Sequence, residues 1–218
     1  MINVMGQTIT GNAVPSVQFS DVNGRFIPMG NNGIQGSPYL FEQFGMGKLM
    51  MQNGMEAIDS NLNYSLFDHK LYFLKNNGMY LVNQPVKSFQ LSNINKENNT
   101  IVKSFFSGYP NIENNTASTF YELIADGAVY QLLKYSIKHI KESTVYGGAP
   151  FKEYTIDHIY YVYSQTDKKI SIVGNSLTLK SLKKTLPEKA TQLDQLNDML
   201  KLNFKKEEDV KTLFEKLN

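Results

Sequence analysis

Hydrophobic and polar positions alternate with period two through the middle of the chain. Leu62, Tyr64 and Leu66, for example, alternate with polar neighbours, which is typical of a strand with one buried face. Between such segments lie sequences with the glycine that tight hairpin turns prefer. They are Gln52-Asn53-Gly54, Asn76-Asn77-Gly78 and Asp126-Gly127. The pattern therefore predicts a meander of short antiparallel strands.

The predicted strands follow one another along the chain, joined by tight turns or by polar loops. They cover 48–51, 55–58, 62–66, 70–74, 79–82, 86–91, 100–106, 119–125, 128–140, 154–163 and 168–173. We expect them to form a mainly β domain over 39–175, either a sandwich or a strongly curved sheet. Residues 1–38 are rich in Gly, Asn, Ser and Pro, and are predicted to be an irregular N-terminal arm.

The hydrophobic period changes at about residue 176, which predicts C-terminal helices over 176–218. Leucines between 177 and 186 indicate a first short helix, and apolar residues then recur at three- and four-residue spacing to the C-terminus. Thr185 to Glu188 matches a capping box with Pro187 in the first turn. The acidic run 207–209 favours the start of the last helix. We expect these helices to pack their apolar face on the β-domain.

Composition narrows the class of protein. The chain has 218 residues, of which 41% are hydrophobic and 19% charged, as in a globular protein. Its net charge is only +2 and Arg25 is its one arginine, so we expect no nucleic-acid partner. Cysteine is absent, which excludes disulfides, thiolate metal sites and a cysteine nucleophile. No apolar run reaches 18 residues, so no transmembrane helix is predicted.

The histidines are the first candidates for chemistry. His69 falls in a predicted turn, whereas His139 and His158 lie on predicted strands and could bind zinc together with Asp157. Adjacent residues of a strand point to opposite faces, however, so Asp157 and His158 do not easily share a metal. Ordinary strand histidines are the favoured interpretation, and we predict neither a metal site nor a cofactor.

Catalytic motifs are equally sparse. Gly45-Met46-Gly47-Lys48 has glycines like a phosphate loop, but Leu49 replaces the required Ser or Thr and a strand follows, so a glycine turn is predicted. Glu122, Glu153 and Asp157 are the carboxylates on or beside strands. A glycosidase uses two carboxylates that meet in space, which sequence alone does not reveal. A solvent-facing position is the favoured interpretation of each, and we predict no catalytic residue.

Six aromatic residues on or near strands allow two interpretations. They could line a groove for a sugar or lipid, or fill the core, and the core is favoured because aromatic residues are common in any sheet. These residues are Phe105, Phe106, Tyr109, Tyr160, Tyr161 and Tyr163. No ligand-binding residue is therefore singled out.

The N-terminus leaves two localisations open. It lacks the basic region and the long apolar region of a signal peptide, but Val4-Met5-Gly6 is compatible with the end of a leader. Gln7 would then begin the mature chain. The alternative is a cytoplasmic protein that starts at Met1.

Several short motifs within 36–91 and 176–218 together carry a resemblance to known proteins. They are Gly36-Ser37-Pro38-Tyr39-Leu40, Gly47 before a strand, the run from Leu62 to Phe73, Pro85-Val86 with Phe89, and the run from Leu202 to Val210. In these motifs the chain resembles exported β-rich proteins of Bacteroidota whose function is uncharacterised, although Ser65 stands where they usually have Asn. The resemblance implies export to the periplasm or cell envelope through a signal peptide, and it carries over no catalytic residue.

Three hypotheses of function follow. The first is a non-enzymatic exported or envelope protein with a structural or macromolecule-binding role, whose protein or glycan partner is unknown. The second is a carrier or sensor of a hydrophobic ligand, because 9 Met, 13 Phe and 13 Tyr are available to line a cavity. The third is a glycan-active enzyme that uses paired carboxylates.

Overall fold

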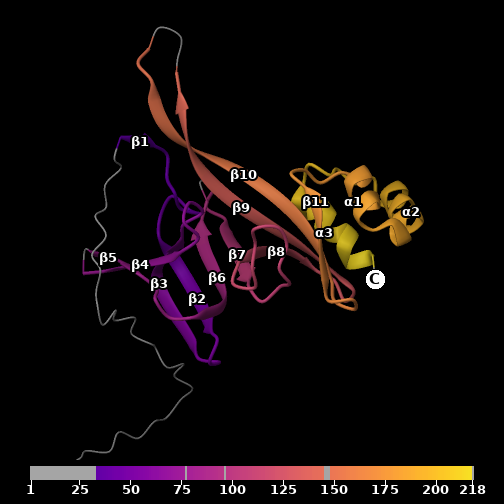
Figure 1. Cartoon of the computed structure of the whole chain (residues 1–218), viewed down its shortest axis with the longest axis horizontal. Coiled ribbons are helices and arrows are strands. Elements are labelled where there is room, and N and C mark those ends of the chain that lie inside the picture. The colour runs from indigo at the N-terminus through magenta and orange to yellow at the C-terminus, as the bar shows by residue number, and fades with distance from the viewer. Residues whose placement is uncertain (1–32, 77, 96, 145–147, 218) are drawn as a thin grey trace, which may run out of the picture.

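The computed structural model describes residues 33–76, 78–95, 97–144 and 148–217, without the side chains of 59 and 60. In this part of the chain one sheet of eleven strands carries three α-helices at one end (Figure 1). The strands are β1 (Ile34–Gln35), β2 (Gly45–Met51), β3 (Glu56–Tyr64), β4 (Leu71–Lys75), β5 (Gly78–Leu81), β6 (Val86–Ile94), β7 (Thr100–Phe106), β8 (Tyr121–Asp126), β9 (Tyr130–Ser143), β10 (Phe151–Ser164) and β11 (Lys169–Gly174). The helices are α1 (Leu179–Thr185), the 3-10 turn η1 (Pro187–Lys189), α2 (Ala190–Leu200) and α3 (Glu207–Lys216).

The predicted fold class is confirmed. The strands follow the order β1-β10-β9-β8-β7-β6-β2-β3-β4-β5, with β11 as a second neighbour of β10. All pairs are antiparallel except β1 with β10, so the sheet is mixed. It is one open sheet rather than the two stacked sheets of a sandwich. The predicted hairpins β2–β3, β4–β5, β8–β9 and β10–β11 are present, but the strands predicted at 55–58 and 62–66 are the single strand β3.

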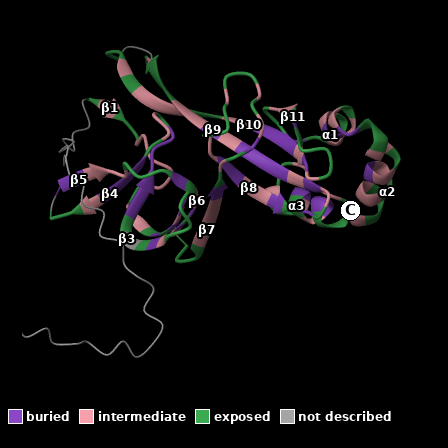
Figure 2. Ribbon diagram, turned by 60° about the horizontal axis from the view of Figure 1, so that its bottom comes forward, coloured by how far each residue is buried: buried purple, intermediate pink, exposed green. Residues whose placement is uncertain are grey.

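A weak joint divides this sheet into two halves. β7 and β8 pair through only Phe105↔Glu122 and Phe106↔Tyr121. On one side of the joint, β2, β3, β4, β6 and β7 enclose an apolar core of their own. On the other side, β8–β11 bury one face against the three helices, whereas the opposite face carries a cluster of tyrosines with Leu133 and Ile170. Figure 2 shows the buried segments along β9 and β10 and in α3.

The glycines before Lys48 lie inside β2, so the predicted glycine turn is wrong. A Cβ atom on Gly47 would lie 2.5 Å from Cδ1 of Leu62 and 2.8 Å from Cδ2 of Leu91. A Cβ on Gly45 would lie 2.4 Å from the carbonyl oxygen of Ser92. Glycine is therefore used here for close packing of neighbouring strands, a role that resembles a turn signal in sequence.

The alternation predicted that Asn63 and Ser65 are exposed, but the structure buries both. Asn63 is fully buried because its amide donates hydrogen bonds to the carbonyl oxygens of Phe41 (2.9 Å) and Gln43 (3.2 Å). The irregular segment before β2 thus covers the second face of the strand. Both faces are therefore buried at the end of β3, over residues 62–64, where a single buried face was expected.

The C-terminal helices form as expected but begin at a different cap. Thr178 and Ser181 make the capping box of α1, with the Thr178 hydroxyl accepting from the Ser181 amide at 3.0 Å. The capping box predicted at Thr185 for the following helix is wrong, because Thr185 closes α1 and its hydroxyl donates back to the carbonyl oxygen of Ser181. Pro187 does lie in the first turn of η1, as predicted. Buried residues of the helices, including Leu182, Leu213 and Phe214, pack with the strands of the second half-sheet.

A long hairpin extends beyond both half-sheets. β9 and β10 pair along all 14 residues, whereas β8 pairs with β9 only up to Lys134. Beyond this point residues 136–143 and 151–158 form a twisted projecting hairpin, which we call the arm and which β1 joins at Lys152 and Glu153 (Figure 1). Alternation predicted both strands but not that they pair with each other over their full length. Gly147, in the loop predicted to connect these two strands, lies outside the described residues. Residues 1–32, which include the predicted end of a leader and most of the predicted irregular N-terminal segment, also lie outside them.

Candidate functional site

Charged side chains from four elements meet where the second half-sheet contacts α3. Lys134 of β9 places its Nζ 2.6 Å from Oε1 of Glu207 in α3 and 3.9 Å from Oε2 of Glu122 in β8. Lys103 of β7 pairs with the same Glu122. Glu122 is only 6% exposed, so its favoured interpretation as a solvent-facing residue is wrong. We call these four residues the ion-pair cluster.

Strand register and a helix start bring the cluster together. Glu122 lies opposite Lys134 in the β8–β9 ladder and opposite Phe105 in the β7–β8 ladder. Lys103, two residues before Phe105, therefore points to the same face of the sheet. Glu207 is in the first turn of α3, where the helix dipole stabilises a carboxylate.

Tyr160 joins the cluster from β10. Its hydroxyl donates to Oε1 of Glu207 at 2.7 Å, and the ammonium group of Lys134 lies 5.9 Å from the centre of its ring. Burial raises the pKa of the Tyr160 phenol, and the neighbouring carboxylate of Glu207 raises it further. For Glu207, burial favours the neutral acid, but the hydrogen bonds from Lys134 and Tyr160 outweigh it and hold its pKa below the ordinary value.

A hydroxyl–imidazole pair lies next to the cluster. Oγ of Ser136 is 2.9 Å from Nδ1 of His158, its direct partner across the β9–β10 ladder. Burial, and after it the cation of Lys134, lower the pKa of His158. The imidazole is therefore neutral at pH 7. Each of the four charges in the cluster has an opposite charge beside it, so the observed contacts attach α3 to the sheet.

The candidate residues singled out from the sequence thus lie in different parts of the structure. The structure brings Glu122, His158 and Tyr160 together, whereas Asp157 lies on the opposite face of β10 with its carboxylate 3.6 Å from Nε2 of His139. Glu153 lies in the arm and accepts a hydrogen bond from Ser143. In the part of the chain that the structure describes, no three His, Cys, Asp or Glu side chains gather as a metal site would require.

His69, the third histidine, occupies the predicted turn between β3 and β4 in a left-handed backbone conformation with φ of +56°. Its two ring nitrogens face two phenols: Nε2 is 2.8 Å from the hydroxyl of Tyr135, and Nδ1 is 3.2 Å from that of Tyr64. Burial lowers the pKa of His69. The ring therefore links the turn to both half-sheets as a neutral group. No sequence signal indicated these partners, because they lie 5 and 66 residues away.

The six aromatic candidates do not line one groove. Phe105 packs in the core of the first half-sheet, and Tyr160 packs under the helices. Tyr109, Tyr161 and Tyr163 belong to the tyrosine cluster on the opposite face. Phe106 is 37% exposed. Five of the six therefore serve packing on three different surfaces.

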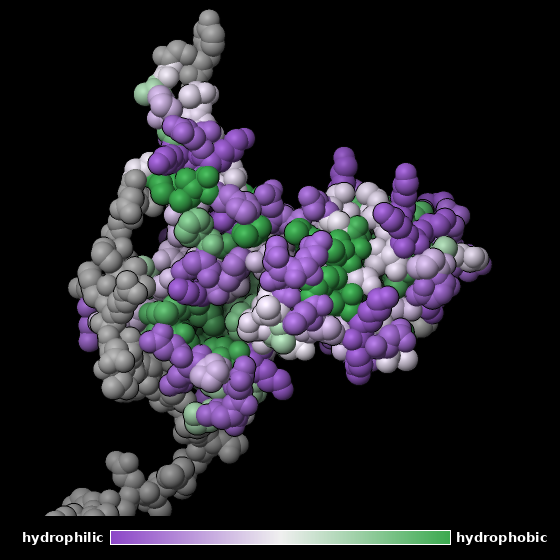
Figure 3. All heavy atoms as spheres, viewed as in Figure 1, coloured by the Kyte–Doolittle hydropathy of each residue, from purple (hydrophilic) through white to green (hydrophobic). Residues whose placement is uncertain are grey.

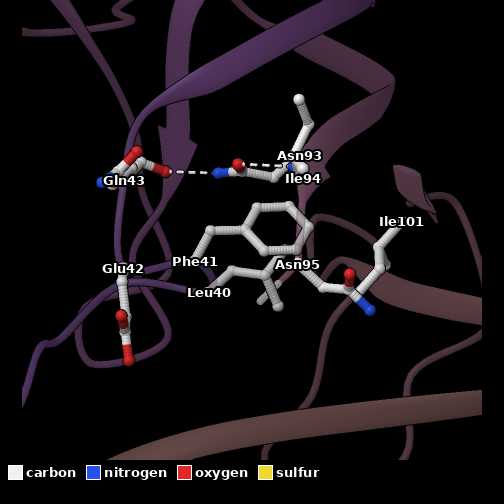
Figure 4. Close-up of a pocket in the computed structure, with 8 residues that line it drawn as sticks. All are labelled: Leu40, Phe41, Glu42, Gln43, Asn93, Ile94, Asn95 and Ile101. Carbon is white, nitrogen blue, oxygen red and sulfur yellow. Dashed lines mark hydrogen bonds between the residues drawn. The ribbon is translucent and has the colours of Figure 1, made fainter. Parts of the chain in front are cut away.

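Of the pockets among the described residues, two adjoin groups named above, and both are open to solvent. The one in Figure 4, of about 370 Å³, lies at the ends of β6 and β7 and combines apolar and amide side chains. Its residues are Leu40, Phe41, Glu42, Gln43, Asn93, Ile94, Asn95 and Ile101. The Asn93 amide is occupied, because it donates to the carbonyl oxygen of Gln43 at 2.8 Å and accepts from the Ile94 amide at 2.7 Å (Figure 4). A second pocket, of about 410 Å³, lies beside His69, between the start of β4 and the end of β5.

The arm exposes apolar side chains on the same face as the ion-pair cluster. Ile140 and Ile156 are diagonal neighbours across the ladder and are 40% and 44% exposed. Tyr154, opposite Ile140, packs edge-on against Phe67, which is 45% exposed. We call these four residues the arm patch. Figure 3 shows hydrophobic residues at the base of the arm with hydrophilic residues around them.

No family model matches the chain, and no curated protein or solved structure is significantly similar to it. Among the described residues, no helix is both long and apolar enough to cross a membrane.

Proposed function

We propose that this chain is a non-enzymatic, exported or cell-envelope protein that binds another macromolecule, and that the arm is its binding element. The observation that carries the proposal is the arm patch. Large apolar side chains are exposed there on a two-stranded element that projects from the body (Figure 1). Exposed apolar groups that cluster and are rimmed by polar residues mark interaction sites.

The polar chemistry of the chain supports the non-enzymatic part of the proposal. The two carboxylates that approach each other, Glu122 and Glu207, lie on either side of Lys134. A glycosidase needs one carboxyl group that holds a proton at working pH. The hydrogen bond from the Lys134 ammonium group holds the pKa of Glu207 below its ordinary value and so favours its ionised form. The arrangement therefore suits attachment of a helix better than acid–base catalysis.

The test compares capture of components from an envelope extract by the immobilised full chain and by two variants. Ile140→Ser combined with Ile156→Ser removes the exposed apolar groups of the arm, whereas Ile172→Ser makes the same change at an exposed position of β11 outside the arm. We expect at least tenfold less saturable binding for the arm variant and no change for the control. Equal binding by all three proteins would refute the assignment to the arm.

Enzymatic activity and localisation are tested separately. A panel of chromogenic glycosides is incubated with the wild type and with Glu122→Gln, and we expect no turnover by either protein. Hydrolysis by the wild type that Glu122→Gln abolishes would overturn the non-enzymatic proposal. Cell fractionation of the protein in its native host should recover it in the envelope or periplasm, and recovery in the cytoplasm would refute export.

A second candidate function rests on the pocket in Figure 4. Its volume of about 370 Å³ is within the range of small-molecule sites, and Leu40, Phe41 and Ile94 provide an apolar wall. This favours a small amphipathic ligand over a fully enclosed lipid. Titration with a fluorescent anilinonaphthalene dye, with Ile94→Asp as the blocking variant, tests it. Dye binding that Ile94→Asp leaves unchanged would exclude this pocket.

A further inference from the structure

The outer edge of β10 is interrupted. β9 occupies the inner edge of this strand over its whole length, so β1 and β11 both lie on the outer edge. The ladder with β1 ends at Glu153, and the ladder with β11 begins at Tyr160. Among the described strands, none pairs with residues 154–159 on that side. We call this stretch the edge gap.

The edge gap has the length and chemistry of a strand-binding site. Six residues of a strand span about 20 Å, and roughly three of them direct both their N–H and C=O groups to the outer edge. An unpaired edge of this kind is a template for another extended segment. A short strand bound there would extend the outer edge from β1 to β11.

Two different faces flank the gap. Tyr154 and Ile156, with Ile140 beside them, make one face apolar at the outer end of the gap, and His158 lies on the same face at its inner end. On the other face the charged residue is Asp157, whose side chain is 70% exposed and whose carboxylate lies 3.6 Å from Nε2 of His139. Lys138, opposite Ile156 on the first face, already donates hydrogen bonds from its ammonium group to the carbonyl oxygens of Ser37 and Tyr39. An incoming strand therefore matches the gap if apolar residues alternate with polar ones and a basic residue lies beside Asp157.

The flanking strands argue against a second copy of the chain as the occupant. β10 has 14 residues, so in a symmetric β10–β10 pair each strand would continue beyond the six-residue gap. It would then collide with β1 at one end and with β11 at the other. A linear peptide of about six residues has no such continuation.

We propose that the edge gap binds a short extended peptide segment of a partner protein by strand addition, with alternating apolar residues and a basic residue beside Asp157. This inference rests on the proposed function, because it names the class of partner that the arm recognises. Backbone hydrogen bonds to β10 supply the affinity, and the two faces of the gap supply the specificity.

The test uses the full chain and the capped peptide Ser-Thr-Val-Lys-Val-Thr-Ser. Binding is measured by isothermal titration, and the site by NMR hydrogen exchange of the backbone amides. We expect alternate amides within 154–159 to become protected. Two versions of the peptide are N-methylated at odd or at even residues, so that each version loses the N–H donors of one edge. Only the version methylated on the edge that faces β10 should lose affinity, by at least tenfold. Asp157→Lys should weaken binding about threefold, the size of an exposed ion pair, and Asp198→Lys on α2 should not.

Each other outcome overturns the inference. One is the absence of binding, and another is protection of amides outside the gap. Equal loss by both N-methylated peptides would also exclude strand addition. If the amides of 154–159 are protected in the absence of peptide, and if this protection increases with protein concentration, the edge binds a second copy of the chain. If the peptide fails but the arm variant still loses envelope binding, the proposed function stands and only strand addition is refuted.

Discussion

Lys134→Met is the most informative test of how the ion-pair cluster stabilises the protein. The substitution keeps the length of the side chain but removes the cation between Glu122 and Glu207. Removing one partner of a fully buried pair costs about 3–5 kcal/mol, since the other charge is left uncompensated. Here Glu122 keeps Lys103 and Glu207 keeps the hydroxyl of Tyr160, and Glu207 is also one-third exposed. We therefore expect a loss of about 2 kcal/mol in the free energy of unfolding.

Urea unfolding followed by circular dichroism measures this loss. With a denaturant slope of roughly 2 kcal/mol per molar, the midpoint should fall by about 1 M. Lys48→Met is the matched control, because its ion pair with Glu56 at 3.0 Å is exposed and should contribute less than about 1 kcal/mol. A double-mutant cycle with Glu207→Gln isolates the Lys134–Glu207 interaction. If Lys134→Met and Lys48→Met shift the midpoint equally, the cluster does not attach α3 as we argue.

Three further predictions follow from the same contacts. Gly47→Ala should lower the free energy of unfolding by about 1–3 kcal/mol, measured by urea unfolding, because the new methyl overlaps two leucine side chains. The pKa of Glu207 is lowered in the folded state, so ionised Glu207 stabilises the fold above the unfolded pKa of about 4.3. This stabilisation is lost as the pH falls through the folded-state pKa. In a curve of unfolding free energy against pH, Glu207→Gln should therefore flatten the decrease at acid pH. The pKa of His69 is lowered too, so stability should fall as pH drops below about 6.5, and thermal unfolding of His69→Gln should show a smaller fall.

The sequence was sufficient to predict the local structure because each hairpin and helix has a local signal. Asn53-Gly54 marks the β2–β3 turn, and leucine spacing marks the helices. Where the predictions fail, a tertiary contact decides. Gly47 is glycine because Leu62 and Leu91 approach it from neighbouring strands. Asn63 is buried because a distant irregular segment accepts its amide protons.

The candidate site was predictable only in part for the same reason. Glu122, His158 and Tyr160 were singled out by residue type, but their grouping depends on register across three ladders. Glu207 was interpreted as a residue of a helix start. It has that role, and in addition its carboxylate reaches Lys134, 73 residues away. No spacing in the sequence encodes this contact.

The cluster and the arm are mechanically connected through the same two strands. The first residues of β9 and the last of β10 are fixed by the helices, the ion-pair cluster and β11, whereas β1, residues 37–39 and Leu66 contact the arm at a few positions. The arm is therefore held more firmly at its base than along the rest of its length. Ser136 and His158 lie at the boundary, one step from the cluster and at the start of the arm. Attachment of α3 to Lys134 thus fixes the strands from which the arm projects, and this keeps the edge gap in one orientation before any partner binds.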